Sequence, residues 1–278
     1  MLETIDDIKL PAKVHEVLRT YFHAMNSELP DLLSSFYVIG SLSLGAFIEG
    51  RSDIDFVAVT KRPLSEPEIL QLQRIHRMLK KQCKSAGLDG KYTVEEHLFG
   101  FGETAYLSPY FNDGRLIGFE LFDRGSIDAY RLKKYGLVII GRPIESYQLP
   151  ENWTYLKEKT LDNVNTYWTA WKERCSIKTS LEFPASLLSK SFIEWGVLGV
   201  TRLYFTLNEE DIISKAGAGE YALHHVPVKH HRILKEALRI RNGSQVAYYK
   251  SVFARRKEML EYMTFVINEC NKLHQTRR

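Results

Sequence analysis

The sequence predicts an α+β protein of two domains, an α/β domain over residues 1–148 and an all-α helical domain over residues 149–278. The length of 278 residues suits two domains of ordinary size better than one. Short strand-like runs alternate with helical spacing only in the first half of the chain. A breaker at Gly141-Arg142-Pro143 and a linker-like stretch over 146–152 then separate that half from long helical patterns.

The first half alternates between helical and strand patterns. Apolar residues from Val14 to Met25 recur at helical spacing and predict a helix over 12–26. The stretch 63–84 predicts a second helix, because its acidic start and basic end match the helix macrodipole. Apolar or alternating runs predict strands over 36–39, 55–60, 91–98, 116–122 and 137–140.

The second half contains little strand pattern. Helical spacing extends over 156–175, 185–207, 230–241 and 244–274. Ser214 is the expected N-cap of a further helix that follows it. These patterns predict a helical bundle.

Composition limits the classes of protein to which the chain can belong. No apolar run approaches the roughly 20 residues that cross a membrane, so we expect no membrane partner. Cys83, Cys175 and Cys270 are far apart and odd in number, which fits neither a disulfide framework nor a metal cluster and favours a reducing cytoplasm. The net charge of +4 is too weak to predict a nucleic-acid partner.

Two aspartates stand at the head of a predicted strand. Asp53 and Asp55 are two residues apart, so in a strand their carboxylates share one face while Ile54 turns into the core. Two such carboxylates repel each other unless one is protonated or a cation binds, and Mg²⁺ prefers hard oxygen ligands. The preceding strand ends at Gly40-Ser41, where the backbone can approach a ligand and a hydroxyl can hold a phosphate oxygen. The combination suits nucleotidyl transfer from a metal-bound nucleoside triphosphate.

The stretch 40–59 reads GSLSLGAFIEGRSDIDFVAV. It resembles the signature of the DNA polymerase β-like nucleotidyltransferases: Gly-Ser, a short loop with glycine, then Asp-x-Asp. In the form SDID it resembles the aminoglycoside adenylyltransferases of the streptomycin and spectinomycin type. The resemblance implies an N-terminal nucleotidyltransferase domain with a mixed sheet, Mg²⁺ on the two aspartates, and contacts to the triphosphate of ATP from Gly40, Ser41 and Ser52.

A third carboxylate is expected on a neighbouring strand, either to complete the metal site or to accept a proton from the attacking hydroxyl. The candidates are Asp89, Glu95 and Glu96. The segment GLDGKYTVEEHL resembles a family segment in which an acidic residue opens the next strand, and this favours Asp89, although an Asp-Gly pair is also a common turn. Glu95 has the same parity in a regular strand and stays an alternative, whereas Glu96 would point to the other face.

The second half contains two cations at a spacing that the same family uses. The stretch 195–223 reads WGVLGVTRLYFTLNEEDIISKAGAGEYAL. It resembles a segment in which an Arg within an apolar helix, and a Lys thirteen residues later, reach the triphosphate. Those residues here are Arg202 and Lys215. The alternative is that Arg202 forms an internal ion pair with Glu194 or Glu209.

The resemblance implies a cytoplasmic enzyme that moves AMP from ATP, with Mg²⁺, to a hydroxyl of a small-molecule acceptor. An aminoglycoside-type antibiotic is one such acceptor, and antibiotic resistance would be the associated trait. The family places an acidic group just before the helical Arg, where this chain has Phe192, so a different hydroxylated small molecule fits as well. Two alternatives stay open: a nucleotidyltransferase acting on RNA or protein, and a non-catalytic nucleotide sensor.

Overall fold

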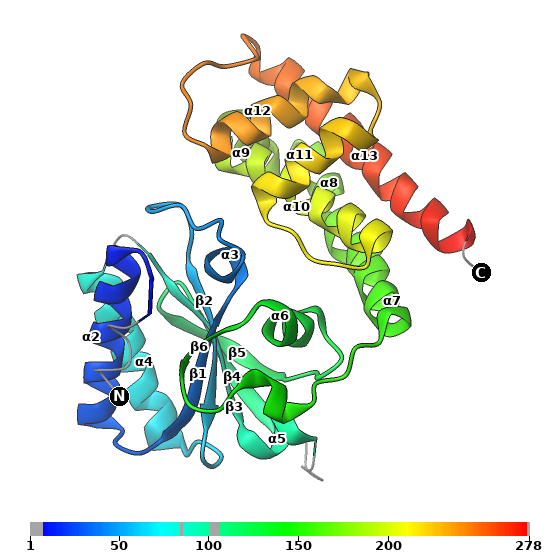
Figure 1. Ribbon diagram of the computed structural model, residues 1–278. Coiled ribbons are helices and arrows are strands. Elements are labelled where there is room, and N and C mark those ends of the chain that lie inside the picture. Colours follow the sequence, from blue (N-terminus) through cyan, green and yellow to red (C-terminus); the bar gives the residue numbers. More distant parts are fainter. Residues whose placement is uncertain (1–7, 84–85, 101–105, 277–278) are drawn as a thin grey trace. The chain divides into compact units, whose positions relative to one another are not determined.

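The computed structural model describes residues 8–83, 86–100 and 106–276. It divides into two compact units, Met1–Asn152 and Trp153–Arg278, which are described one at a time. Figure 1 shows strands only in the first unit and helices alone in the second. The predicted α+β class, with a mixed sheet followed by an all-helical region, is confirmed.

The first unit is built on one six-stranded sheet with the order β5-β4-β3-β2-β1-β6. β2 and β3 are parallel and the other neighbours are antiparallel, so the sheet is mixed. A parallel pair needs a crossover, and the long helix α4 (Glu66–Gln82) supplies it between β2 and β3. The strands are β1 (Leu33–Ile39), β2 (Ile54–Thr60), β3 (Leu88–Val94), β4 (Leu107–Asn112), β5 (Arg115–Leu121) and β6 (Leu137–Ile140).

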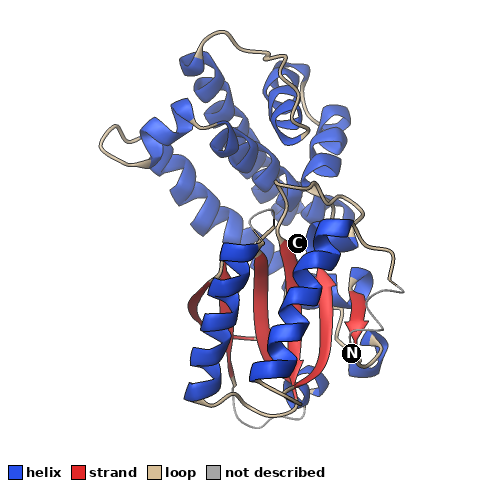
Figure 2. Cartoon of the chain, turned by 90° about the vertical axis from the view of Figure 1, so that its left-hand side faces the viewer, coloured by secondary structure: helices blue, strands red, loops and turns tan. Residues whose placement is uncertain are grey.

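Helices cover both faces of the sheet. Two long helices, α2 (Ala12–Glu28) and α4 (Glu66–Gln82), pack on one face, and Figure 2 shows them side by side in front of the strands. Because side chains alternate along a strand, Phe36 and Val38 of β1 enter that core while Tyr37 enters the core on the opposite face. The shorter elements of the unit are α3 (Gly40–Ser43), α5 (Glu95–Phe99), α6 (Ile127–Tyr135) and the 3-10 turn η1 (Ile144–Tyr147).

The structure corrects the predicted elements at several places in the first unit. The strand predicted over 91–98 is wrong in its second half, because β3 ends at Val94 and α5 begins at Glu95. Acidic residues in a first turn are a helix-start signal, and Glu95 and Glu96 provide it. β4 and α6 were not predicted. The end predicted for the second helix, Lys84, lies outside the described residues.

The second unit consists of helices packed around α10, which contacts α7, α9, α11, α12 and α13. Gly196 and Gly199 of α10 also let the rings of Trp171 in α8 and Trp168 in η2 approach closely, since a Cβ atom there would lie 2.9 Å and 2.1 Å from those rings. The predicted helix over 156–175 is interrupted by a π-helical turn, and the one predicted from 244 begins at Val252. The elements are α7 (Trp153–Asn163), η2 (Val164–Trp168), α8 (Thr169–Ser176), α9 (Glu182–Leu188), α10 (Lys190–Glu209), α11 (Lys215–His225), η3 (Val228–His230), α12 (His231–Arg241) and α13 (Val252–Thr276).

No described helix has both the length and the apolar character that a membrane span requires.

The second unit contains a buried ion-pair network around Glu236 of α12. Arg239 donates to both of its carboxylate oxygens, at 2.8 and 2.7 Å, and the amide of Tyr248 donates at 3.0 Å. The guanidinium of Arg255 lies 3.7 Å away. Because these side chains are almost fully buried, each charge depends on the others for solvation.

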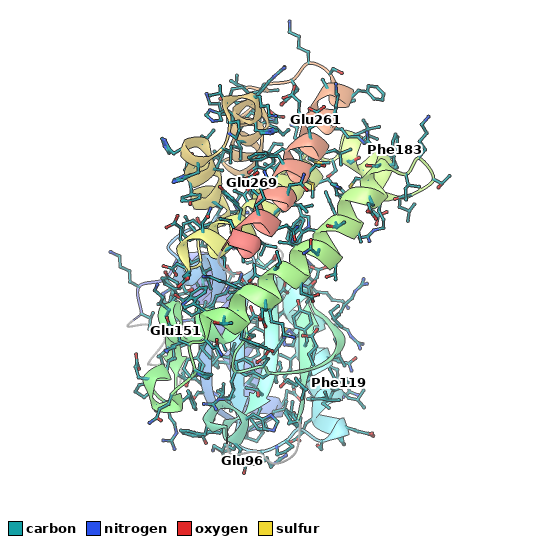
Figure 3. All side chains as sticks on the ribbon, turned by 90° about the vertical axis from the view of Figure 1, so that its right-hand side faces the viewer. Glu96, Phe119, Glu151, Phe183, Glu261 and Glu269 are labelled. Carbon is teal, nitrogen blue, oxygen red and sulfur yellow. The ribbon has the colours of Figure 1, made fainter. Side chains whose placement is uncertain are left out.

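Glu236→Ala should lower the free energy of unfolding by about 3–5 kcal/mol, since it leaves two buried guanidinium groups without their shared carboxylate. Urea denaturation followed by circular dichroism measures the change. Glu261→Ala is the matched control, because Glu261 lies exposed on α13 (Figure 3) and its ion pair with Lys257 is at the surface. A loss below about 1 kcal/mol for Glu236→Ala would contradict the structural role of the network.

Candidate functional site: an acidic edge of the sheet

The end of β1 and the starts of β2 and β3 lie at the same end of these neighbouring strands. This end of the sheet carries Asp53, Asp55 and Asp89 and is called the acidic edge here. β1 runs antiparallel to β2, and Ile39 stands opposite Asp55. β3 runs parallel to β2, and Asp89 stands opposite Asp55. Neighbouring residues in register point to the same face, so the carboxylates of Asp55 and Asp89 lie side by side.

Gly40, directly after β1, packs against the side chain of Asp55. Its backbone has a φ of +73°, and a Cβ atom on it would lie 2.0 Å from Oδ2 of Asp55. Only glycine meets both conditions without strain. Ser41 follows within the short helical turn α3, part-exposed beside the same edge.

Asp53 lies one residue before β2, not inside it, so its position does not follow from strand parity. Its Oδ1 accepts from the amide of Gly87 at 3.3 Å. A Cβ atom on Gly87 would lie 2.8 Å from Oδ1 of Asp53 and 3.3 Å from Oδ1 of Asp89. The structure therefore brings the carboxylates of Asp53 and Asp89 to the same place, on either side of a glycine.

Asp89 is held by the β4–β5 turn, which sequence reasoning did not identify. The side-chain amide of Asn112 donates to Oδ2 of Asp89 at 2.9 Å, and the backbone amide of Asp113 donates to Oδ1 at 2.8 Å. Asp113 and Gly114 both have positive φ, 50° and 74°, as in the tight turns that join antiparallel strands. An Asn-Asp-Gly run is the signal that could have predicted this turn, although not its contact with Asp89.

Burial dominates the electrostatics of the acidic edge. Burial raises the pKa of Asp55 to about 6; Asp89 and Asp53 add to this shift, and Arg131 of α6 opposes it. Burial also raises the pKa of Asp89 to about 6, with Asp53 adding and the amide of Asp113 opposing. Taking these carboxylates out of water thus costs free energy that a bound cation would recover.

Ser52 is buried and closes the loop that leads to the aspartates. The amide of Ile48 donates to its hydroxyl oxygen at 3.1 Å, and the amide of Ser52 donates to the carbonyl of Ile48 at 2.9 Å. The alternative third carboxylate, Glu95, lies instead at the start of α5. It forms an ion pair with Arg142 at 2.5 Å. Of the two, only Asp89 lies beside Asp55.

The predicted cations lie in the second unit, in α10 and at the start of α11. Ser214 caps α11 through a hydrogen bond from the amide of Gly217 at 3.0 Å, which places Lys215 in its first turn. The ammonium of Lys215 is 3.8 Å from the Glu194 carboxylate and 5.0 Å from the centre of the Trp195 ring.

Glu194 and Glu209 are the acids that the sequence suggests as partners of Arg202. Glu194 also accepts from Arg241, at 3.2 Å, in a buried pair. The carboxylate of Glu209 accepts a hydrogen bond from the Tyr221 hydroxyl at 2.5 Å. Arg202 itself is part-exposed in the otherwise mostly buried α10.

The donor set of the acidic edge fits Mg²⁺ in the mode that this ion usually adopts. Among the described residues, no group of three or more His, Cys, Asp or Glu side chains is arranged to hold a metal ion. Mg²⁺ seldom uses such a cage: it takes one or two carboxylates and completes its shell with waters and substrate phosphates. Asp55 and Asp89 supply hard carboxylate oxygens, and burial makes their negative charge unfavourable unless a cation binds. They are therefore suitable as the few carboxylate ligands of a Mg²⁺ ion.

Residues 182–265 match the family model for the aminoglycoside adenylyltransferase C-terminal domain. Over these residues the second unit is similar to the C-terminal domain of the aminoglycoside adenylyltransferases. No curated protein sequence matches it.

Among solved structures, the chain is similar to the spectinomycin adenyltransferase AAD(9) from Enterococcus faecialis, crystallised with ATP and spectinomycin. The match has a TM-score of 0.67 and 16% identity, and it covers 92% of this chain and 99% of the other. At that identity the likeness shows the fold. It extends over both units, whereas the family model covers part of the second.

Asp55→Asn should stabilise the metal-free protein at neutral pH. The folded-state pKa of about 6 lies above the ordinary value of 3.8, so between these pH values the folded chain binds more protons than the unfolded chain. The stability that the protonated Asp55 carboxyl group contributes is fully present below pH 4 and is lost as pH rises through 6, where the folded chain must hold a buried charge. The substitution should therefore raise the free energy of unfolding by about 1–2 kcal/mol at pH 7.5, a gain that shrinks towards pH 4.

Urea denaturation between pH 4 and 8 in the presence of a chelator measures this gain for Asp55→Asn. Asp162→Asn is the control, because Asp162 is exposed on α7 in the other unit. An equal effect of both substitutions, or a gain that does not depend on pH, would show that the charge of Asp55 is not costly in the fold.

Asn112→Ala should raise the pKa of Asp89 further, because it removes a donor that stabilises the ionised carboxylate. Carboxyl ¹³C shifts recorded during a pH titration report this pKa directly. Asn271→Ala, in the hydrogen-bonded pair with Asn165 on the second unit, serves as the control. An unchanged titration of Asp89 would exclude Asn112 as its positioning residue.

Proposed function

We propose that this adenylyltransferase-like chain transfers AMP from ATP to a hydroxyl group of a small polar molecule, in a reaction that depends on Mg²⁺. The observation that carries the proposal is the acidic edge, where Asp55 lies between Gly40 and Asp89, and Asp53 and Asp89 lie on either side of Gly87. Buried carboxylates that lie close together destabilise the fold, so a purely structural role does not explain why they are present at this edge.

Asp53 and Asp55 are the proposed Mg²⁺ ligands. When bound, the ion would polarise the phosphate oxygens and neutralise charge that develops as pyrophosphate leaves. Gly40 keeps side-chain atoms away from the space beside Asp55, so a phosphate can approach the backbone of α3. Ser41 and Ser52 would donate hydroxyl groups to that phosphate.

Asp89 is the group that we propose to orient the acceptor hydroxyl and take its proton, with direct metal ligation as its other role. A pKa near 6 lies close to neutral pH, where a general base is both ionised and able to hold a proton. Each of its oxygens accepts one hydrogen bond from the β4–β5 turn and retains a second lone pair for the substrate. The turn thus fixes the orientation of the carboxylate without occupying it.

Arg202 and Lys215 are proposed to bind the phosphates. Their positions fall within the stretch that matches the family model, 182–265. The nearby carboxylate of Glu194 and ring of Trp195 restrict where the Lys215 ammonium can lie, which lowers the entropy lost on binding an anion.

The acceptor that we propose is an aminoglycoside-type or similarly hydroxylated small molecule. Support comes from the family match and from the solved relative, whose structure holds ATP and spectinomycin. Phe192, at the position where an acidic residue was expected, stacks on Trp171 at 5.3 Å between ring centres. It therefore contributes to the packing of the unit and offers no charge to a cationic acceptor.

Asp53→Asn should reduce AMP transfer by at least about 100-fold, because one of two charges that hold the metal is lost. The assay is mass spectrometry of an aminoglycoside panel, spectinomycin and streptomycin included, incubated with ATP and Mg²⁺ and searched for products heavier by one AMP. Omitting Mg²⁺ should abolish the product for the unmodified chain.

Asp162→Asn is the control for this experiment and should retain full transfer. Retention of full transfer by Asp53→Asn would refute the metal assignment. ATP binding without pyrophosphate release across the whole panel would favour a nucleotide sensor, and AMP on RNA or protein alone would replace the small-molecule acceptor.

A further inference from the structure

A cavity of about 500 Å³ lies between the last turns of α4 and the β4–β5 turn, within the first unit. Its charged lining residues, here called the basic pocket, are Arg77, Lys80, Lys81, Asp113 and Arg115. None of them is among the residues assigned above to ATP, metal or acceptor. Four cationic residues and one acidic residue therefore line one small space.

The carboxylate compensates only part of this charge. Asp113 pairs with Lys80. Arg77 donates to the neutral side-chain amide of Gln73 at 2.8 Å. Lys81 and Arg115 form no ion pair with any described residue. Three positive charges thus remain close together, and their repulsion favours any anion that enters.

The macrodipole of α4 explains part of the pattern but not all of it. Lysines in the last turn of a helix stabilise its negative end, so Lys80 and Lys81 have an ordinary structural reason to be there. Arg115 does not, because it opens a different element, β5, and still lines the same cavity.

Gly114 brings the two walls of the pocket together. Its φ is +74°, and a Cβ atom on it would lie 2.7 Å from the Cβ of Lys80 and 3.1 Å from the carbonyl oxygen of His76. The turn can approach α4 this closely only with glycine at that position. The β4–β5 turn and α4, which carry the lining residues, are therefore held together by close backbone packing.

We propose that the basic pocket binds a small phosphate polyanion that carries a diphosphate group. Its volume lies within the range of small-ligand sites, and two guanidinium groups can each form paired hydrogen bonds with phosphate oxygens. The lining contains no aromatic side chain on which bases could stack, which favours a compact anion over single-stranded RNA. This site adds a ligand to the chain beyond the proposed reaction.

The test is a titration of the ¹⁵N-labelled full chain with sodium pyrophosphate in the absence of Mg²⁺. The amides of Gly114 and Arg115 should shift in a saturable manner, apart from any shifts in α10 and α11. The variant R77Q/K81Q/R115Q should weaken the affinity reported by Gly114 at least about 10-fold, since three charge-assisted contacts are lost. The control K13Q/K257Q/K272Q removes the same number of charges from exposed positions and should leave it unchanged.

Three further titrations separate the possible sources of an effect. ADP should produce the same shifts as pyrophosphate, because both carry a diphosphate group. Sulfate at equal ionic strength should not compete with pyrophosphate below tens of millimolar. A short RNA that shifts these amides when pyrophosphate does not would overturn the proposal in favour of nucleic acid.

Equal weakening in both triple variants would also overturn it, since net charge alone would then explain the binding. The outcome does not depend on catalysis: Asp53→Asn should lose AMP transfer and keep the pyrophosphate shifts at Gly114. Failure of the proposed function and failure of the basic pocket are therefore distinguishable.

Discussion

The convergence of like charges at one edge of a sheet is the constraint on which the rest of this structure depends. Backbone register sets Asp55 opposite Asp89, so the two residues stay neighbours for as long as β2 pairs with β3. Burial then raises the pKa of both groups. A fold that keeps such an arrangement gives up stability at neutral pH, and a cation that binds the folded state alone would return it by mass action.

The surroundings of the acidic edge are built to hold these charges in place. Glycine at position 40 lets the backbone pass against Asp55, the amide of Gly87 reaches Asp53, and two donors from the β4–β5 turn fix Asp89. None of these groups carries a full positive charge. Dipoles that orient carboxylates leave their negative charge available to a metal ion, whereas an arginine in their place would neutralise it.

Features that depend on a short stretch of sequence could be predicted, whereas contacts between distant parts of the chain could not. The Gly-Ser and Asp-x-Asp spacing depends on adjacent strands, so it can be recognised in a short stretch, and the mixed sheet that it implied is confirmed. The contact of Asn112 with Asp89 depends on the antiparallel pairing of β3 with β4, whose partners no local pattern specifies. Glu95 was a plausible third acid only if β3 continued; two acidic residues instead open a helix at that point.

The two halves of the chain support the functional conclusion in different ways. The family match lies in 182–265, which holds Arg202 and Lys215 but none of the three aspartates. Asp55 and Asp89 are supported by register and burial, and Asp53 by its contact with Gly87, all of which are physical properties of the first unit alone. A triphosphate carries more negative charge than one Mg²⁺ neutralises, so an acidic edge without further cations would repel it. The adenylyltransferase proposal therefore requires both sets of residues.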